Sequence, residues 1–236
     1  MNSSIRALLA VSLSVFLTAC PKATRPPSKP SEPTVPGEVP TADLRGATVY
    51  EVSAKDSDIR ILVYRAGTLA RLGHNHVMTA GALTGKVWIN PALEKSGLQL
   101  SFPVEQMVVD DPAARKASGD DFPPDIPAAD RDGTRKNMLR PEVLDGEHFH
   151  NITLRSTKVS GTASAPRILT HVTIKDASRD VDVPAKVTVE GSKLTASGEF
   201  DLKQTDFGIK PFSIGLGTLS VKDELHVSFK IVALKK

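Results

Sequence analysis

Two His-x-His pairs are the residues of this chain best suited to chemistry: His74 with His76, and His148 with His150. In extended backbone, side chains two positions apart lie on the same face, so each pair would present two imidazoles together. Imidazole is a common ligand of zinc and copper, and four imidazoles from two pairs would complete a tetrahedral site. Two alternatives stay open. The histidines could be surface or hydrogen-bonded loop residues, or a polar rim that contacts the head group of a bound molecule.

Other reactive patterns are weaker. The aspartates at positions 110, 111, 120, 121 and 125 do not have EF-hand spacing, and a solvated loop is the favoured interpretation. His171 and His226 occupy intermediate strand positions and are expected on an outer face. The chain contains no Gly-x-Ser-x-Gly elbow and no phosphate-binding glycine loop, and its single cysteine is near the N-terminus. We therefore predict a binding protein rather than an enzyme.

The N-terminus has the pattern of a bacterial lipoprotein signal. Arg6 precedes an apolar run from Ala7 to Leu17, which is too short to span a bilayer. Leu17-Thr18-Ala19-Cys20 resembles a lipobox, in which the cysteine is acylated after cleavage. We predict a signal peptide at 1–19 and lipidation at Cys20. The alternative is an ordinary secretory signal with an incidental cysteine.

Residues 20–45 are predicted to be the acylated cysteine followed by a proline-rich tether. Prolines recur through this stretch and favour extended polyproline II conformation, so it would act as a spacer from a membrane. The expected location is the bacterial cell envelope, facing the periplasm. The net charge of +3, without a basic cluster, argues against a nucleic-acid partner.

Residues 46–236 form the predicted folded domain. Apolar residues alternate with polar ones at period two, which indicates strands with one buried face. Helical propensity occurs at 128–139. The pattern predicts an all-β fold, an antiparallel barrel of about eight strands with a short helical insertion. The strands are expected at 48–52, 59–64, 83–89, 98–104, from 152, and at 168–174, 181–189, 194–202 and 225–231.

Several motifs in this domain resemble the YceI-like family from about residue 47 to residue 233. They are Arg155-Ser156-Thr157-Lys158, the run from Val172 to Val181, Gly198-Glu199-Phe200, Asp206-Phe207-Gly208-Ile209 and Val221-Lys222-Asp223-Glu224-Leu225. The resemblance implies a lipocalin-like barrel of secreted or periplasmic proteins that bind polyisoprenoid lipids in an apolar lumen. The chain departs from the family pattern at Leu72–Val77 and at Phe149-His150, where a ligand mouth is expected.

A lipid in such a lumen would contact aliphatic and aromatic side chains, with a few polar groups near the mouth. The alternative is that these side chains fill the barrel and leave no cavity, as in a structural or stress-related envelope lipoprotein that binds no ligand. The expected partners are the lipid and, through the acyl anchor, a membrane. No cofactor is expected beyond a bound isoprenoid lipid, and a homodimer is left open. The predicted lipid-binding residues are Val87, Ile89, Leu98, Leu100, Phe102, Ile152, Leu154, Val172, Ile174, Phe200, Phe207, Ile209 and Phe212.

Overall fold

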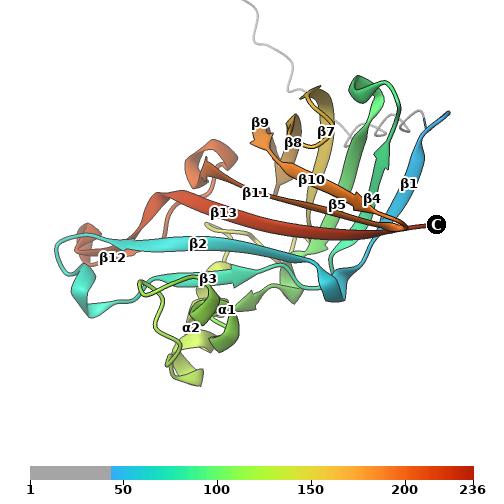
Figure 1. Ribbon diagram of the computed structural model, residues 1–236. Helices are drawn as coiled ribbons and strands as arrows, with labels where there is room; N and C mark the ends of the chain where they lie inside the picture. Colours follow the sequence, from blue (N-terminus) through green and yellow to red (C-terminus); the bar gives the residue numbers. More distant parts are fainter. Residues whose placement is uncertain (1–43) are drawn as a thin grey trace, which may run out of the picture. The chain divides into compact units, whose positions relative to one another are not determined.

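Thirteen strand segments, two α-helices and six short 3₁₀ helices lie within residues 44–236, the part of the chain that the computed structural model describes (Figure 1). The predicted signal peptide, Cys20 and most of the predicted tether lie outside the described residues. The strands are β1 Thr48–Val52, β2 Asp58–Ala66, β3 His76–Thr79, β4 Thr84–Ile89, β5 Gly97–Pro103, β6 Val108–Val109, β7 Asn151–Gly161, β8 Pro166–Ile174, β9 Ala177–Pro184, β10 Lys186–Glu190, β11 Lys193–Lys203, β12 Ser213–Ile214 and β13 Leu219–Lys235; the α-helices are α1 Pro112–Ala117 and α2 Ala128–Met138.

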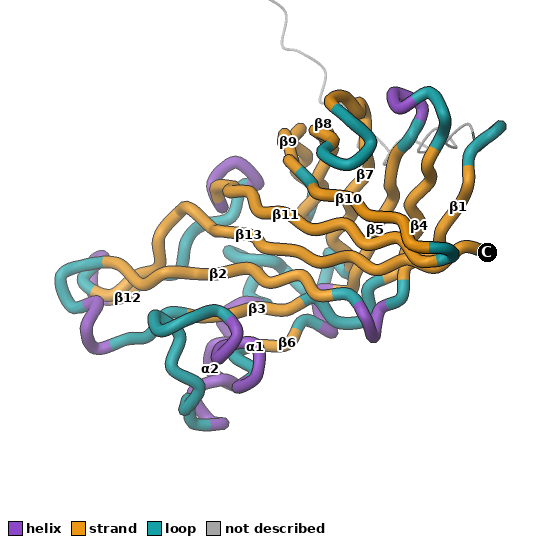
Figure 2. The backbone as a smooth tube through the Cα atoms, viewed as in Figure 1, coloured by secondary structure: helices purple, strands orange, loops and turns teal. Residues whose placement is uncertain are grey.

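The long strand β13 is the centre of the sheet. Its first part pairs with β2, and its last residues pair with β1 along the same edge. On its other edge it pairs with β11 along the full length of that strand. The sheet order is β6-β3-β2-β13-β1-β4-β5-β7-β8-β9, and every pairing is antiparallel. The chain tube in Figure 2 shows this continuous sheet curving from β3 around to β9.

The sheet does not close into a complete barrel, because β9 forms no strand pairing with β11. The two strands approach at Gly198, where an added Cβ would lie 2.3 Å from the Pro184 carbonyl oxygen. Pro184 also lacks the N–H that a ladder would need. After β9, Ala185 donates instead to the carbonyl of Pro166, 3.0 Å away. The closing edge is therefore a close packing contact rather than a hydrogen-bonded ladder.

The predicted all-β, lipocalin-like fold is confirmed, with corrections in detail. The alternation at 181–189 is not one strand: it divides into β9 and β10 at Ala185, which is buried. The polar interval after residue 110 contains α1, with Asp111 as its N-cap and Pro112 at its first turn. The number of strand segments exceeds the expected eight mainly because short strands such as β3, β6 and β12 add to the sheet.

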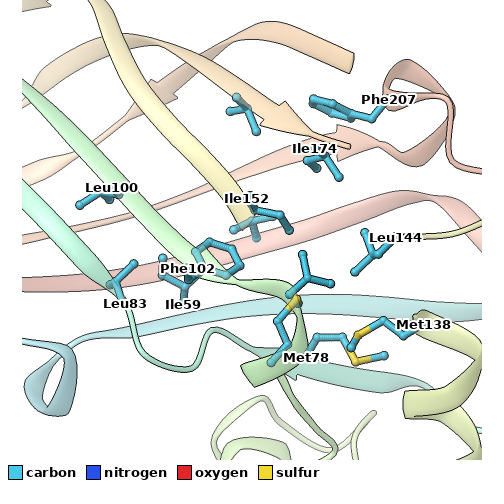
Figure 3. Close-up of a cluster of buried hydrophobic side chains, with 14 of the residues drawn as sticks. Ile59, Met78, Leu83, Leu100, Phe102, Met138, Leu144, Ile152, Ile174 and Phe207 are labelled. Carbon is cyan, nitrogen blue, oxygen red and sulfur yellow. The ribbon is translucent and has the colours of Figure 1, made fainter. Parts of the chain in front are cut away.

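One hydrophobic core lies on the concave face of the sheet (Figure 3). Leu100, Phe102 and Ile152 come from neighbouring strands, and Met138 and Leu144 come from α2 and the segment after it. The α2 segment is held there by Arg135, which donates to the carbonyls of Met107 and Glu105. In this way α2 covers part of one end of the lumen. No helix among the described residues is long and apolar enough to cross a membrane.

A smaller apolar cluster lies on the opposite face of β2. Leu62 and Val77 pack there with Phe122, which follows α1. Tyr64 meets Phe122 edge to face, with ring centroids 5.5 Å apart. The two faces of β2 are therefore both covered, and the outer cluster fixes α1 against β3.

Candidate functional site

Two adjacent cavities lie inside the curved sheet. We name them the inner cavity, of about 130 Å³, and the mouth cavity, of about 520 Å³. Both are lined by Ile61, Ile152, Ile174, Leu202 and Val227, which lie at the boundary between them. The curved sheet therefore encloses open space and not a fully packed core.

The inner cavity is apolar. Among its lining residues, only Ser96, Thr170 and the indole N–H of Trp88 offer polar side-chain groups, and none is charged. Val87, Leu98 and Phe200 line this cavity yet are only partly buried, as expected for side chains that border an open space. Such a surface can take up hydrocarbon but offers a head group almost no hydrogen bonds.

The mouth cavity differs because polar groups gather along its wall. Apolar residues such as Met78, Leu144 and Phe212 line it together with residues of β2, of the β2–β3 connection and of α2. A lumen with an apolar inner end and a partly polar outer end suits an amphiphilic ligand. The polar side chains of the wall are Arg65, His74, His76, Asp130, Thr134, Asn137, Gln204 and Ser220.

The structure places most of the predicted lining residues on the lumen. Ile209 and Phe212 line the mouth cavity, whereas Phe207 is buried in the core and borders neither cavity. That these side chains contact a lipid stays a prediction. The predicted lining residues that border the inner cavity are Val87, Ile89, Leu98, Leu100, Phe102, Ile152, Leu154, Val172, Ile174 and Phe200.

Some lumen residues were missed by the sequence analysis. Ile61 lies on the same face of β2 as Ile59 and Val63, so strand alternation could have identified it. Asp130 and Asn137 of α2 carry no comparable sequence signal, because the face that a short polar helix turns inward depends on its packing.

A cluster of ionisable side chains borders the mouth cavity. The Nδ1 atom of His76, at the start of β3, lies 2.7 Å from Oδ2 of Asp110. The other carboxylate oxygen, Oδ1, accepts from Nη1 of Arg115 at 2.5 Å and from the backbone N–H of Val77 at 2.8 Å. The ring of His74 meets that of His76 edge to face, with centroids 4.6 Å apart. Asp110 is thus a buried anchor for both a histidine and an arginine.

Local backbone structure brings these groups together. Asp110 follows the short strand β6, which pairs with β3, and its N–H donates to the Val77 carbonyl at 2.8 Å. Its φ of 53° is in the left-handed region, which aspartate tolerates better than most residues. Asp111 then caps α1, and this short helix directs Arg115 back onto Asp110. The expected solvated aspartate loop is wrong for Asp110, whose side chain is fully buried.

The charges of the cluster compensate one another. Burial acts to raise the pKa of Asp110, but hydrogen bonds from His76, Val77 and Arg115 prevail and hold it below its usual range. Burial lowers the pKa of His74, and the neighbouring His76 adds to this effect. Within the described chain, two buried side-chain nitrogens have no hydrogen-bond partner, and both are in this cluster: Nε2 of His74 and Nη2 of Arg115.

The remaining histidines do not join this cluster. His148 is exposed and pairs with Asp145 at 2.8 Å, so the two His-x-His pairs do not form one four-imidazole site. Among the described residues, the one group of three side chains able to share a metal ion is His74, His76 and Asp110.

His171 and His226 face carboxylates on neighbouring strands. His171 pairs with Asp180 of β9, and His226 pairs with Asp201 of β11, each at 2.7 Å. Each partner is the residue directly opposite in the strand register. Neither histidine lines a cavity, in keeping with the expected outer face.

An exposed apolar rim lies beside the mouth cavity. It consists of Leu69 and Leu72 from the β2–β3 connection and Ile214 and Leu216 from the β12–β13 turn; Leu216 is fully exposed. The two loops are joined by a hydrogen bond from the Leu69 N–H to the Thr218 carbonyl, 2.8 Å long. Leu72 also lines the mouth cavity, so the rim adjoins this cavity.

An antiparallel sheet curved around an apolar lumen defines a lipocalin-like protein with an internal binding cavity. The YceI-like domain family matches residues 50–233, and the chain belongs to this family. No curated protein matches the chain.

Similar solved structures support the same fold. The BcnA protein of Burkholderia cenocepacia shares 16% sequence identity with a TM-score of 0.58, covering 77% of this chain and 99% of BcnA. A polyisoprenoid binding domain from Saccharophagus degradans, implicated in plant cell wall breakdown, shares 12% identity with a TM-score of 0.53, covering 80% and 99%. The YCEI protein of Campylobacter jejuni shares 12% identity with a TM-score of 0.50, covering 67% and 84%. At these identities the likeness establishes the fold.

Proposed function

We propose that this protein binds an isoprenoid-type or other amphiphilic lipid, with its tail in the inner cavity and its head group in the mouth cavity. The observation that carries the proposal is the difference in polarity between the two adjacent cavities. The inner cavity has no charged lining residue, and the mouth cavity has Arg65, His74 and Asp130 on its wall. The name of the Saccharophagus degradans relative and the family match support a lipid of this class.

The dimensions agree with such a ligand. The inner cavity, of about 130 Å³, is close to the engineered cavity of roughly 150 Å³ that binds benzene, so it holds a short hydrocarbon segment. The mouth cavity, of about 520 Å³, lies within the roughly 300–1,000 Å³ of small-molecule sites. Each buried methylene contributes about 0.8 kcal/mol, so a branched tail that fills both needs few polar contacts.

The protein would act as an envelope lipoprotein that stores or transports this lipid, without catalysis. The lipobox-like sequence ending at Cys20 supports an acyl anchor, and the proline-rich stretch after it supports a spacer. The exposed rim supports direct contact with a lipid bilayer, because Leu72 and Leu216 present apolar surface next to the opening of the lumen. Lipid could then enter the mouth cavity without crossing water.

Mass spectrometry of an organic extract of the purified full-length protein tests the proposal. We expect an amphiphilic lipid in near-stoichiometric amount. Ile61→Trp would place a larger side chain at the boundary of the two cavities, both of which Ile61 lines, and we expect it to reduce the bound lipid strongly. Val189→Trp, on an exposed position of β10, is the matched control and should retain the lipid. A wild-type protein that yields no lipid and takes up none from vesicles would contradict the proposal.

A further inference from the structure

His74, His76 and Asp110 each place a donor atom within 4.8 Å of the other two. Two imidazoles and one carboxylate are the protein ligands of zinc sites that keep an open coordination position, and also of non-haem iron(II) sites. We propose that these three residues bind a divalent transition-metal ion of the zinc type at the wall of the mouth cavity. This site would be an addition to lipid binding and does not depend on it.

The unpaired nitrogen of His74 is the first argument for a metal. Buried polar atoms nearly always have a partner, and an exception calls for an ion or a water at that position. Nε2 of His74 is buried and has no partner in the protein, and the His74 ring packs edge to face against the ring of His76. A metal ion held with His76 and Asp110 would supply the missing partner.

The hydrogen bond between His76 and Asp110 is the second argument. An ionised carboxylate can only accept, so Nδ1 of His76 carries the proton in the metal-free protein. A metal ion could replace that proton while the imidazole moves its N–H to Nε2. With zinc bonds of about 2.0–2.2 Å, two donors in tetrahedral geometry lie roughly 3.3 Å apart. The 2.7 Å distance between Nδ1 of His76 and Oδ2 of Asp110 would therefore increase slightly, and His74 would move toward these two atoms.

The surroundings of Asp110 orient its free oxygen. Arg115 and the Val77 N–H both hold Oδ1, which leaves Oδ2 facing His76. Hydrogen bonds to a ligating carboxylate are a usual feature of metal sites, because they fix the ligand before the metal arrives. Arg115 also balances the charge of Asp110, so the empty site does not bury an unpaired anion.

The position of the three residues also sets access to the site. His74 and His76 line the mouth cavity, whereas Asp110 lies behind them and does not. A remaining coordination position would therefore face the cavity, where a water or a ligand head group could occupy it. Calcium and magnesium are poor candidates because they require mostly oxygen ligands.

Zinc binding to the full-length protein tests the site. Chelator-treated protein is titrated with zinc chloride by calorimetry, and its metal content is measured after dialysis. We expect one zinc ion per chain and no binding of magnesium chloride. His74→Ala and His76→Ala should each weaken zinc binding by at least about tenfold. His148→Ala with His150→Ala, the other His-x-His pair, is the matched control and should bind like the wild type.

His74→Ala is the decisive variant, because it removes a nitrogen that makes no hydrogen bond and leaves the Asp110–Arg115 pair intact. Circular dichroism verifies its fold, and lipid content is measured on the same samples. Absence of stoichiometric zinc in the wild type, or unchanged zinc binding in both single variants, would overturn the metal site even if lipid is present. Absence of lipid with zinc retained would count against the proposed function alone.

Discussion

The guanidinium of Arg115 and the carboxylate of Asp110 form an ion pair from which solvent is fully excluded, with Nη1 and Oδ1 2.5 Å apart. The pair joins α1 to the turn after β6, and Arg115 also donates to the carbonyls of Asn75 and Pro123, each at 2.6 Å. One side chain thus ties together three segments around the ionisable cluster. This part of the wall of the mouth cavity is held by buried polar contacts rather than by apolar packing alone.

Removing Arg115 should therefore be costly. Loss of one partner of a buried ion pair leaves an uncompensated charge, and Arg115→Ala should lower the free energy of unfolding by roughly 3–5 kcal/mol. Urea denaturation measures the change. The control is Arg167→Ala in the exposed pair with Asp182, where we expect at most about 1 kcal/mol. Equal effects of the two substitutions would show that the buried pair has no special role.

The close approach of β9 and β11 predicts a steric effect at Gly198. A Cβ there would lie 2.3 Å from the Pro184 carbonyl oxygen and 2.8 Å from the Phe229 ring, so Gly198→Ala should destabilise the protein by about 1–3 kcal/mol. Gly133→Ala in α2 is the matched control. Its Cβ would meet no atom within 4 Å, and helix propensity predicts stabilisation by about 0.5–1 kcal/mol. Thermal unfolding compares the two variants, and a neutral Gly198→Ala would argue against tight packing at this edge.

The exposed rim predicts an effect on the rate of lipid uptake. Leu216 is fully exposed and adopts a left-handed backbone conformation that aspartate tolerates. Leu216→Asp should slow lipid transfer from anionic vesicles several-fold, because a charge replaces apolar surface at the bilayer contact, and should leave the final amount bound unchanged. Val189→Asp, at an exposed position on β10, should transfer lipid at the wild-type rate. Identical rates for both variants would exclude the rim as the membrane contact.

The pairing of His148 with Asp145 predicts that a local contribution to the stability of the fold depends on pH. Its hydrogen bond to Asp145 and the charge of that carboxylate raise the pKa of His148 above its usual value. The interaction stabilises the fold fully at pH values below about 6.5, where the histidine is protonated in both states, and is lost as pH rises through the folded pKa. NMR titration of Asp145→Asn should show the pKa of His148 shifted down. Asp182→Asn, at a remote site, should leave the His148 titration unchanged.

Much of the fold could be predicted from the sequence because strand alternation is a local property. The bounds of β1 agree with the expected strand, and α2 ends one residue before its expected end. The split at Ala185 could not be predicted, because apolar alternation continues through it. The break falls where Ala185 donates to the carbonyl of Pro166, a contact between residues far apart in the sequence.

The sequence by itself determined the all-β character of the domain, its YceI-like motifs and the inward-facing apolar side chains, since these follow from residue types two positions apart. Tertiary structure decided what those residues enclose. Whether apolar side chains fill a lumen or line it depends on the distance between strands, which no single strand encodes. Likewise, His74 and His76 are neighbours in sequence, but only the pairing of β3 with β6 and the turn of α1 give them Asp110 and Arg115.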